Sequence, residues 1–170
     1  MKKNKILLPV FVCLVFAIPA FAQLNASLRA NDLKPLLGIW RGNLTYLDYS
    51  SNKPYSMPAD IKISQIGKSS NFILFNTYPD EPQANSTDTI IISKGGTMIS
   101  KESVISVHRK VKGTIEFTNE IQGEDGNDNK AALIRHIYKA YKKNFSIRKE
   151  VQFKGEQKWI LRNEYKYEKK

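Results

Sequence analysis

Few residues in this chain are of the types that catalysis needs. It contains two histidines, His108 and His136, and neither lies in the His-Glu-x-x-His spacing of a catalytic zinc site. The single cysteine, Cys13, lies in an apolar run near the N-terminus, and there is no Gly-x-Ser-x-Gly nucleophile motif. Glu116 and Glu120 share one face of a predicted strand, but that face is polar and solvated. The sequence therefore predicts a protein that is not an enzyme.

Polar and aromatic side chains instead share the apolar faces of several predicted strands. A core built only for stability tends to exclude polar groups, because each buried one needs a hydrogen-bond partner. Aromatic rings with a few amides and a histidine are what a small-molecule pocket needs. The alternative is that the polar groups bond one another or buried water. We predict a ligand-binding interior lined by Trp40, Leu44, Tyr46, Phe117, Asn119, His136, Tyr138, Leu161 and Tyr165.

His136 has two interpretations. In the predicted strand over 131–141 it shares a face with Ile134, Tyr138 and Ala140. A neutral imidazole in that position could ligate haem iron or bond a ligand carbonyl. A single histidine without a second motif is more often a hydrogen-bonded interior residue. The sequence therefore predicts no cofactor.

Residues 123–129, Gly-Glu-Asp-Gly-Asn-Asp-Asn, are rich in oxygen ligands that suit calcium. Their spacing does not match a calcium-binding EF-hand loop, and no closing glutamate lies at the required distance. Gly, Asn and Asp are also the residues that tight turns favour. We therefore predict an exposed hairpin tip and no metal site.

The elements that would position these residues are β-strands. Apolar and polar residues alternate over short segments separated by turn residues, and no long helical pattern is present. Pro58 marks an edge, bulge or loop in the second segment. We expect an all-β, antiparallel up-and-down barrel of about 8–10 strands. The predicted strands are 38–49, 55–66, 72–78, 87–93, 97–100, 104–111, 114–122, 131–141, 145–153 and 159–167.

The stretch Gly38-Ile39-Trp40 follows a predicted short helical turn over 31–37, for which Asp32 is a plausible N-cap. This arrangement resembles the start of lipocalin-like β-barrels of the calycin superfamily, in which the indole closes one end of the barrel. The resemblance implies that Arg162, in the last strand, stacks on Trp40. The alternation of that strand places Arg162 on the outer face instead.

The absence of a disulfide and of a helix after the barrel makes the chain more similar to bacterial lipocalin-like domains than to secreted lipocalins. It is also similar to the ten-stranded nitrobindin-like haem barrels. Those barrels carry a haem-binding histidine near the C-terminus, and this sequence has no histidine after His136.

The N-terminal residues have the pattern of a secretory signal peptide. Three lysines within the first five residues precede the apolar run 6–18, and Ala20-Phe21-Ala22 fits a cleavage site. The run is shorter than the roughly 20 residues that span a bilayer, although an uncleaved anchor is the alternative. We predict a signal peptide over 1–22, a flexible leader over 23–31 and one lipocalin-like domain over 32–170. The mature protein would be exported to the periplasm or the extracellular space.

The basic residues are unevenly distributed. The net charge is +11, and residues 135–170 hold 12 Lys and Arg but 4 Asp and Glu, whereas residues 23–134 hold 12 of each kind. Such an excess attracts anionic ligands, lipid head groups or acidic envelope polymers, although it more often means only a solvated surface. No recognition-helix pattern indicates nucleic-acid binding.

The leading functional prediction is an exported monomer that binds or carries a small, largely apolar ligand with an anionic or carbonyl end. One alternative is an envelope protein that contacts another macromolecule through its basic C-terminal face, with the barrel as a scaffold. The other is a haem-binding barrel that uses His136.

Overall fold

The computed structural model describes residues 26–48, 51, 53–110 and 113–170. The predicted signal peptide therefore lies outside the described residues. In the described ranges no helix is long and apolar enough to cross a membrane. The elements are η1 (Ala30–Leu36), β1 (Gly38–Asp48), β2 (Lys53–Pro58), β3 (Asp60–Gln65), β4 (Asn71–Thr77), η2 (Pro82–Ala84), β5 (Ser86–Ile91), β6 (Met98–Ile99), β7 (Glu102–Arg109), β8 (Thr114–Asp125), β9 (Lys130–Tyr141), β10 (Asn144–Phe153) and β11 (Ile160–Lys169).

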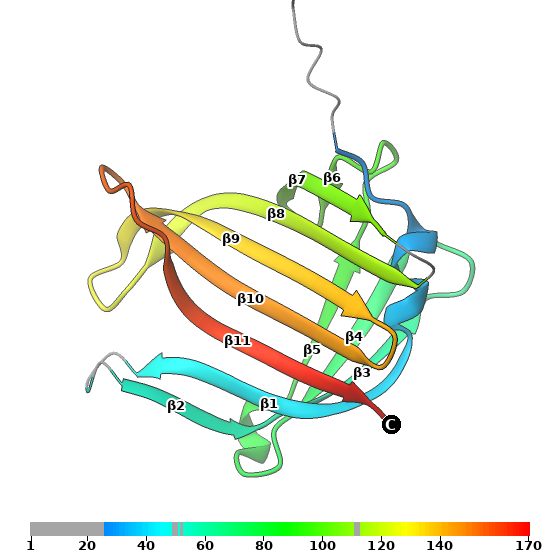
Figure 1. Cartoon of the computed structure of the whole chain (residues 1–170), viewed down its shortest axis with the longest axis horizontal. Helices are drawn as coiled ribbons and strands as arrows, with labels where there is room; N and C mark the ends of the chain where they lie inside the picture. Colours follow the sequence, from blue (N-terminus) through cyan, green and yellow to red (C-terminus); the bar gives the residue numbers. More distant parts are fainter. Residues whose placement is uncertain (1–25, 49–50, 52, 111–112) are drawn as a thin grey trace, which may run out of the picture.

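The strands form one antiparallel sheet that curls into a nearly closed barrel (Figure 1). Its order is β5-β4-β3-β1-β11-β10-β9-β8-β7-β6, and β2 pairs with β1 beside this path. The two outermost strands meet through a bridge between Ile92 and Ile99 and a hydrogen bond from the Ser100 N–H to the Ile91 carbonyl, 2.6 Å. The predicted all-β, antiparallel barrel is thus confirmed.

The predicted strand over 55–66 is two strands, because the chain changes partners after Pro58. β2 pairs with β1 from Asn43 onward, whereas β3 pairs with β1 at Gly38–Trp40. Gly42 lies at the branch, where its carbonyl accepts from the Ala59 N–H, 2.9 Å. A Cβ on Gly42 would lie 1.9 Å from the Lys166 carbonyl oxygen, so β1 and β11 approach this closely only because residue 42 is glycine.

One end of the barrel, called the plug end below, is closed by η1. Leu33 and Leu36 of this helix are each 1% exposed, and Trp40 at the start of β1 is fully buried. The indole Nε1 donates to the Leu36 carbonyl at 2.7 Å, and the indole packs against Phe145 with ring centroids 5.6 Å apart. The opposite end, called the far end, carries the turns between β8 and β9 and between β10 and β11 (Figure 1).

Asp32 lies inside η1 rather than at its N-cap. Its carboxylate accepts from the Arg29 backbone N–H at 2.7 Å and forms a salt bridge with Arg109 of β7 at 2.6 Å. The plug helix is therefore tied to the barrel wall by an ion pair as well as by its leucines.

The residues before η1 also pack on the barrel. The sequence predicts a loose leader over 23–31, whereas Leu28 is 1% exposed and its N–H donates to the Gly96 carbonyl at 2.8 Å. Arg109 donates to the Ser27 carbonyl at 2.7 Å. From Ala26 on, the chain is thus part of the plug, because Leu28 adds apolar burial to that of η1.

Candidate functional site

Five neighbouring strands, β8, β9, β10, β11 and β1, each place a polar side chain at the same level of the inner face. The pairing registers join these residues in a continuous row, since each is the direct cross-strand partner of the next. Directly opposed side chains in antiparallel strands are close enough to interact. We call this row the polar belt; it consists of Asn119, His136, Lys149, Asn163 and Tyr46.

The next row toward the plug end is mainly aromatic. Phe117 stacks on Tyr138 with ring centroids 4.5 Å apart, and Tyr165 stacks on Tyr167 at 5.8 Å. The Tyr165 hydroxyl also lies 3.0 Å from the hydroxyl of Tyr78. Burial raises the pKa of the Tyr138 and Tyr165 phenols, so both are neutral at physiological pH.

Glu102 of β7 faces the polar belt and orients two of its members. One of its carboxylate oxygens accepts from the Asn119 amide at 3.0 Å and lies 2.9 Å from His136 Nδ1. Burial by itself raises the pKa of Glu102, but the hydrogen bonds and charge of His136, with the Asn119 hydrogen bond, bring the pKa below its usual value. The ionised carboxylate therefore fixes the orientation of the imidazole and of the buried amide.

Several of these inner-face groups are partly exposed to solvent. The His136 and Glu102 side chains are 24% and 21% exposed, and the Lys149 side chain is 26% exposed. By contrast, Trp40 and Phe117, on the same inner face but nearer the plug, are fully buried. The barrel interior thus has a packed, apolar half toward the plug end and a polar half toward the far end, in which Glu102, His136 and Lys149 are partly exposed.

Asp125 is the central acid of a second polar cluster on the inner face. Its side chain is 3% exposed, and it lies 2.5 Å from Lys149 Nζ and 2.8 Å from Arg162 Nε. The sequence predicts that 123–129 is an exposed tip, but β8 continues to Asp125 and turns its carboxylate inward. Among the described residues no group of three or more His, Cys, Asp and Glu side chains could hold a metal ion.

A register irregularity corrects the predicted faces of the last strand. The pairing of β10 with β11 shifts between Lys149 and Glu150, so Arg162 is the extra residue and Leu161 lies opposite Glu150. Leu161 is consequently 43% exposed on the outer face, and its prediction as a lining residue is wrong. Such a bulge reverses the faces of the residues beyond it.

Arg162, expected outside, is instead turned inward. Its side chain is 10% exposed, and its guanidinium lies 5.4 Å from the Phe153 ring centroid. The cation beside Trp40 is that of Lys169, whose Nζ lies 5.0 Å from the indole centroid. The contact that the resemblance implies between Arg162 and Trp40 is therefore absent.

The predicted lining residues divide between the two halves of the interior. Trp40 and Phe117 belong to the packed half, where they support the wall. The other predicted residues belong to the polar belt (Tyr46, Asn119 and His136) or to the aromatic row beside it (Leu44, Tyr138 and Tyr165).

Lys149, Asp125, Glu102 and Tyr78 contribute to this site but are absent from the sequence-based prediction. Lys149 lies between Ile147 and Val151 in an alternating segment, so the alternation could have identified it. Asp125 lies in a segment with turn composition, and Glu102 and Tyr78 flank loops. Only the three-dimensional pairing brings these last three residues to the inner face.

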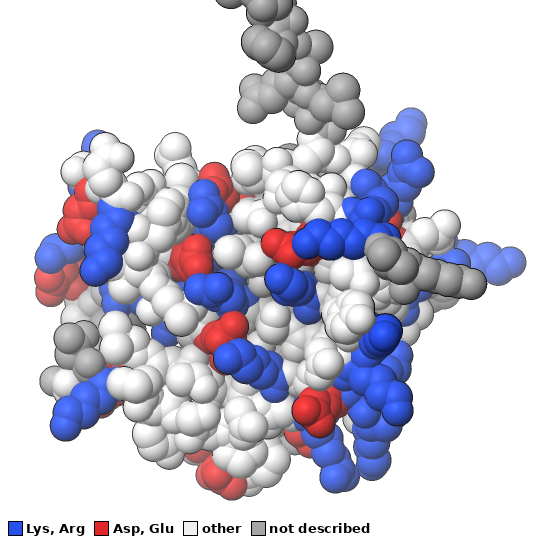
Figure 2. Space-filling view, viewed as in Figure 1, with Lys and Arg blue, Asp and Glu red and all other residues white. Residues whose placement is uncertain are grey.

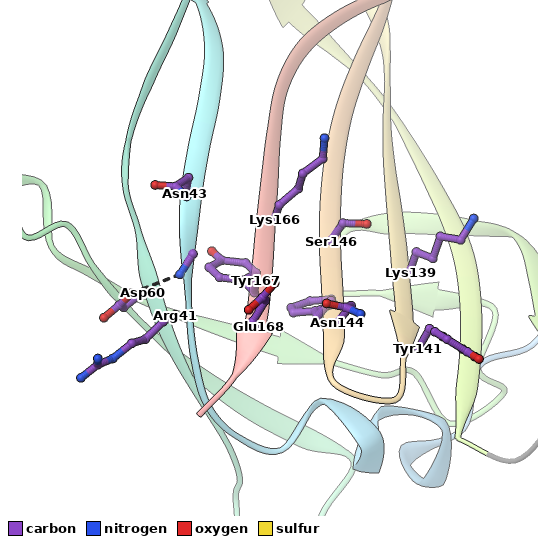
Figure 3. A pocket seen from close by; sticks show the side chains of 12 residues that line it. Arg41, Asn43, Asp60, Lys139, Tyr141, Asn144, Ser146, Lys166, Tyr167 and Glu168 are labelled. Atoms are coloured by element: carbon purple, nitrogen blue, oxygen red, sulfur yellow. Dashed lines mark hydrogen bonds between the residues drawn. The ribbon is translucent and has the colours of Figure 1, made fainter.

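A separate groove of about 810 Å³ lies on the outer face of β1, β11, β10 and β9 (Figure 3). Three cations from three strands line it: Arg41, Lys139 and Lys166. Lys139 pairs with Glu116 at 3.2 Å, and Lys166 with Glu164 at 3.0 Å. The groove also contains amides, a hydroxyl, aromatic side chains and two carboxylates, from Asn43, Asn144, Ser146, Tyr141, Phe145, Tyr167, Asp60 and Glu168.

Comparisons with known proteins identify the fold and no family. No protein-family model matches the chain, and no curated protein matches its sequence. Among solved structures, the chain is similar to Rv2717c from M. tuberculosis, with 14% identity, a TM-score of 0.54, and coverage of 85% of this chain and 99% of that chain. A protein of unknown function from the DUF3598 family of Nostoc punctiforme aligns over 85% of this chain and 50% of its own, with 15% identity and a TM-score of 0.40. The protein is thus defined by its fold as a nearly closed antiparallel β-barrel.

Proposed function

We propose that the protein binds a small amphipathic molecule in the far half of the barrel interior, without transforming it. The observation that carries the proposal is the polar belt: five inner-face polar side chains in one row, of which His136 and Lys149 are partly exposed. Pockets for small molecules combine an apolar lining with a few oriented polar groups. The polar belt provides the oriented polar groups, and the aromatic row directly beside it provides the apolar lining.

The chemistry of the two rows indicates the class of ligand. Tyr138 and Tyr165 offer aromatic rings, and Leu44 offers an aliphatic side chain, to an apolar body. Lys149 and Asn163 offer N–H donors to an anionic or carbonyl end. Lys149 keeps donor capacity beyond its bond to Asp125, because an ammonium group carries three N–H bonds. A ligand with one apolar face and one oxygen-rich end fits this arrangement.

Binding of 1-anilinonaphthalene-8-sulfonate, which has an aromatic body and one anionic group, tests the proposal. We expect saturable fluorescence at one probe per chain, and an affinity that Lys149→Met with Asn163→Leu lowers at least about tenfold, since charge-assisted hydrogen bonds are lost. Leu161→Ser, on the outer face of β11, is the control and should leave the affinity unchanged. Equal affinity in the double variant and the wild type would overturn the proposal.

We further propose that the protein acts after export and that it is a divergent lipocalin-like carrier. The support for export is the signal-peptide pattern of residues 1–22, and the support for the carrier is the barrel with its buried Gly-x-Trp tryptophan. Intact-mass measurement of the protein from the envelope fraction of its own cells should show a chain that begins at Gln23. A full-length chain in the cytosolic fraction would contradict export.

A further inference from the structure

The excess of positive charge in the C-terminal strands is not spread over their length. Toward the far end several cations are paired with acids: Arg135 pairs with Glu120 at 2.6 Å, Arg148 with Glu150 at 2.8 Å, and Arg162 and Lys149 with Asp125. Within residues 135–170, Lys154 and Lys158 of the β10–β11 turn have no carboxylate side chain within salt-bridge distance, and neither do four lysines at the plug end. We call these four the plug-end lysines: Lys142, Lys143, Lys169 and Lys170.

Backbone hydrogen bonds hold the plug-end lysines together. Lys142 and Lys143 form the turn between β9 and β10, and the Lys143 carbonyl accepts from the Lys169 N–H at 2.8 Å. The Lys170 N–H donates to the Ile39 carbonyl at 3.1 Å, which fixes the C-terminal residue beside β1. Figure 2 shows Lys and Arg side chains gathered at the lower right, where Figure 1 places the C-terminus and the β9–β10 turn.

The turn places lysine where the backbone favours another residue. Lys142 has a φ of 50°, in the left-handed region that glycine and asparagine adopt at lower cost. Strained backbone is retained where the surrounding structure or a function requires it. The turn thus keeps a lysine at 142 although glycine or asparagine would fit its backbone better.

Exposed apolar side chains accompany the plug-end lysines. Ile39 and Tyr141 are each 47% exposed, Ile39 beside Lys170 and Tyr141 beside Lys142, whose Nζ lies 5.1 Å from the tyrosine ring centroid. Lysines around an exposed tyrosine and an aliphatic side chain are typical of surfaces that rest in the interface of a bilayer. A soluble polyanion would use the lysines but not the apolar groups.

The outer groove continues this surface. Tyr141, Asn144 and Glu168 belong to its lining and lie next to the β9–β10 turn and the C-terminal residues (Figure 3). Arg41, Lys139 and Lys166 offer N–H donors there that match the oxygens of a phosphate group. The groove is therefore placed to take a phospholipid head group at the edge of the lysine cluster.

From this charge distribution we propose that the plug end docks on a bilayer surface that carries anionic phospholipids. The proposal goes beyond ligand binding and does not depend on it. Each lysine near an anionic surface adds to the attraction, and the effect falls off over a Debye length, so only the end that faces the membrane contributes strongly. Docking by this end leaves the far end, with its polar belt, directed away from the membrane.

Sedimentation with vesicles tests the proposal on the full chain. We expect stronger binding to phosphatidylcholine vesicles that contain about one third phosphatidylglycerol than to pure phosphatidylcholine, and we expect this difference to be lost at high salt. Replacing the four plug-end lysines by glutamine should weaken this binding at least about tenfold. The matched control replaces four exposed far-end lysines, Lys53, Lys130, Lys154 and Lys158, by glutamine, and should retain most of the binding. All variants share the same N-terminal residues, so any membrane affinity of that segment is common to them.

A second pair of variants distinguishes a bilayer from a soluble polyanion. Ile39→Ser with Tyr141→Ser should weaken vesicle binding several-fold, whereas the matched Leu161→Ser with Tyr55→Ser, exposed residues near the far end, should not. Equal losses in the two lysine variants would overturn the proposal. The proposal would also be overturned if the protein bound polyphosphate strongly and if Ile39→Ser with Tyr141→Ser left vesicle binding unchanged.

Discussion

The two ends of the barrel use opposite arrangements of apolar and charged groups. At the plug end the inside is packed with Trp40, Leu33 and Leu36, and the outside carries four lysines without carboxylate partners. At the far end the inside holds Glu102, His136 and other polar groups that are partly exposed, and Lys149 and Arg162 there pair with Asp125. Apolar packing is therefore concentrated inside the plug end, whereas the two proposed binding surfaces lie inside the far end and outside the plug end.

The comparison of the two halves shows how the free-energy cost of burying charged side chains inside the barrel is offset. A charge in a dry core is unfavourable unless it is paired and hydrogen-bonded. Asp125, Lys149 and Arg162 meet that condition together, and Glu102 meets it through Asn119 and His136. The packed half supplies the apolar burial that allows the other half to remain polar.

The largest expected effect contrasts two inner-face residues of the same strand, β1. Trp40→Ala should lower the free energy of unfolding by about 3–5 kcal/mol, because a fully buried indole and its bond to Leu36 are lost. Tyr46→Ala, nearer the far end and half-buried, should cost about 1 kcal/mol. Chemical denaturation measures both values. Equal losses would mean that the interior is packed uniformly and that the two halves do not differ.

The next effect concerns two acids of the same hairpin. Asp125→Ala should cost about 3 kcal/mol, because it leaves Lys149 and Arg162 without their shared carboxylate on the inner face. Asp128→Ala removes an exposed pair with Lys130, in which both side chains are more than half exposed, and should change stability by less than about 0.5 kcal/mol. Thermal and urea unfolding of the two variants measure the contrast. Similar values would show that the Asp125 cluster contributes no more than a surface pair.

A smaller effect is expected from pH. The pKa of Glu102 is lower in the folded protein than its usual value of 4.5, so its ionised form stabilises the fold above that pH. This contribution should be lost as the pH falls from about 4.5 through the lower folded pKa. Glu102→Gln should therefore cost about 1 kcal/mol at neutral pH and flatten the decline of stability in acid. Unfolding curves between neutral pH and pH 3 measure the slope, and a slope identical to the wild type would contradict the role of Glu102.

The smallest expected change in stability comes from a substitution at the plug end that should affect folding and vesicle binding in opposite directions. Lys142→Gly relieves the left-handed backbone at φ 50° and should raise the free energy of unfolding by about 0.5–1 kcal/mol. The same substitution should weaken binding to anionic vesicles by about fivefold, since it removes one lysine. Denaturation and vesicle sedimentation on one preparation measure both effects. If the variant is more stable and binds vesicles as well as the wild type, Lys142 is not part of the docking surface.

Alternation along the strands was sufficient to predict the barrel and much of its inner face. Trp40, Phe117 and Asn119 lie inside because apolar residues repeat with a period of two around them. The pattern failed at Leu161, because one extra residue in β11 reverses the face, and no local signal marks such a bulge. The pattern also failed at Asp125. Residues with turn composition can continue a strand when their side chains pair with inward-facing charges, as Asp125 does with Lys149 and Arg162. Which lysines remain unpaired depends on strand pairing, and so could not be predicted from net charge.

The central claim is that the far half of the interior holds a small molecule, and native mass spectrometry of the protein isolated from its own cells tests it most directly. We predict one bound molecule per chain in the wild type and none in the Lys149→Met, Asn163→Leu variant prepared in the same way. Wild-type protein without a bound molecule, or a bound molecule that remains after both substitutions, would contradict the claim.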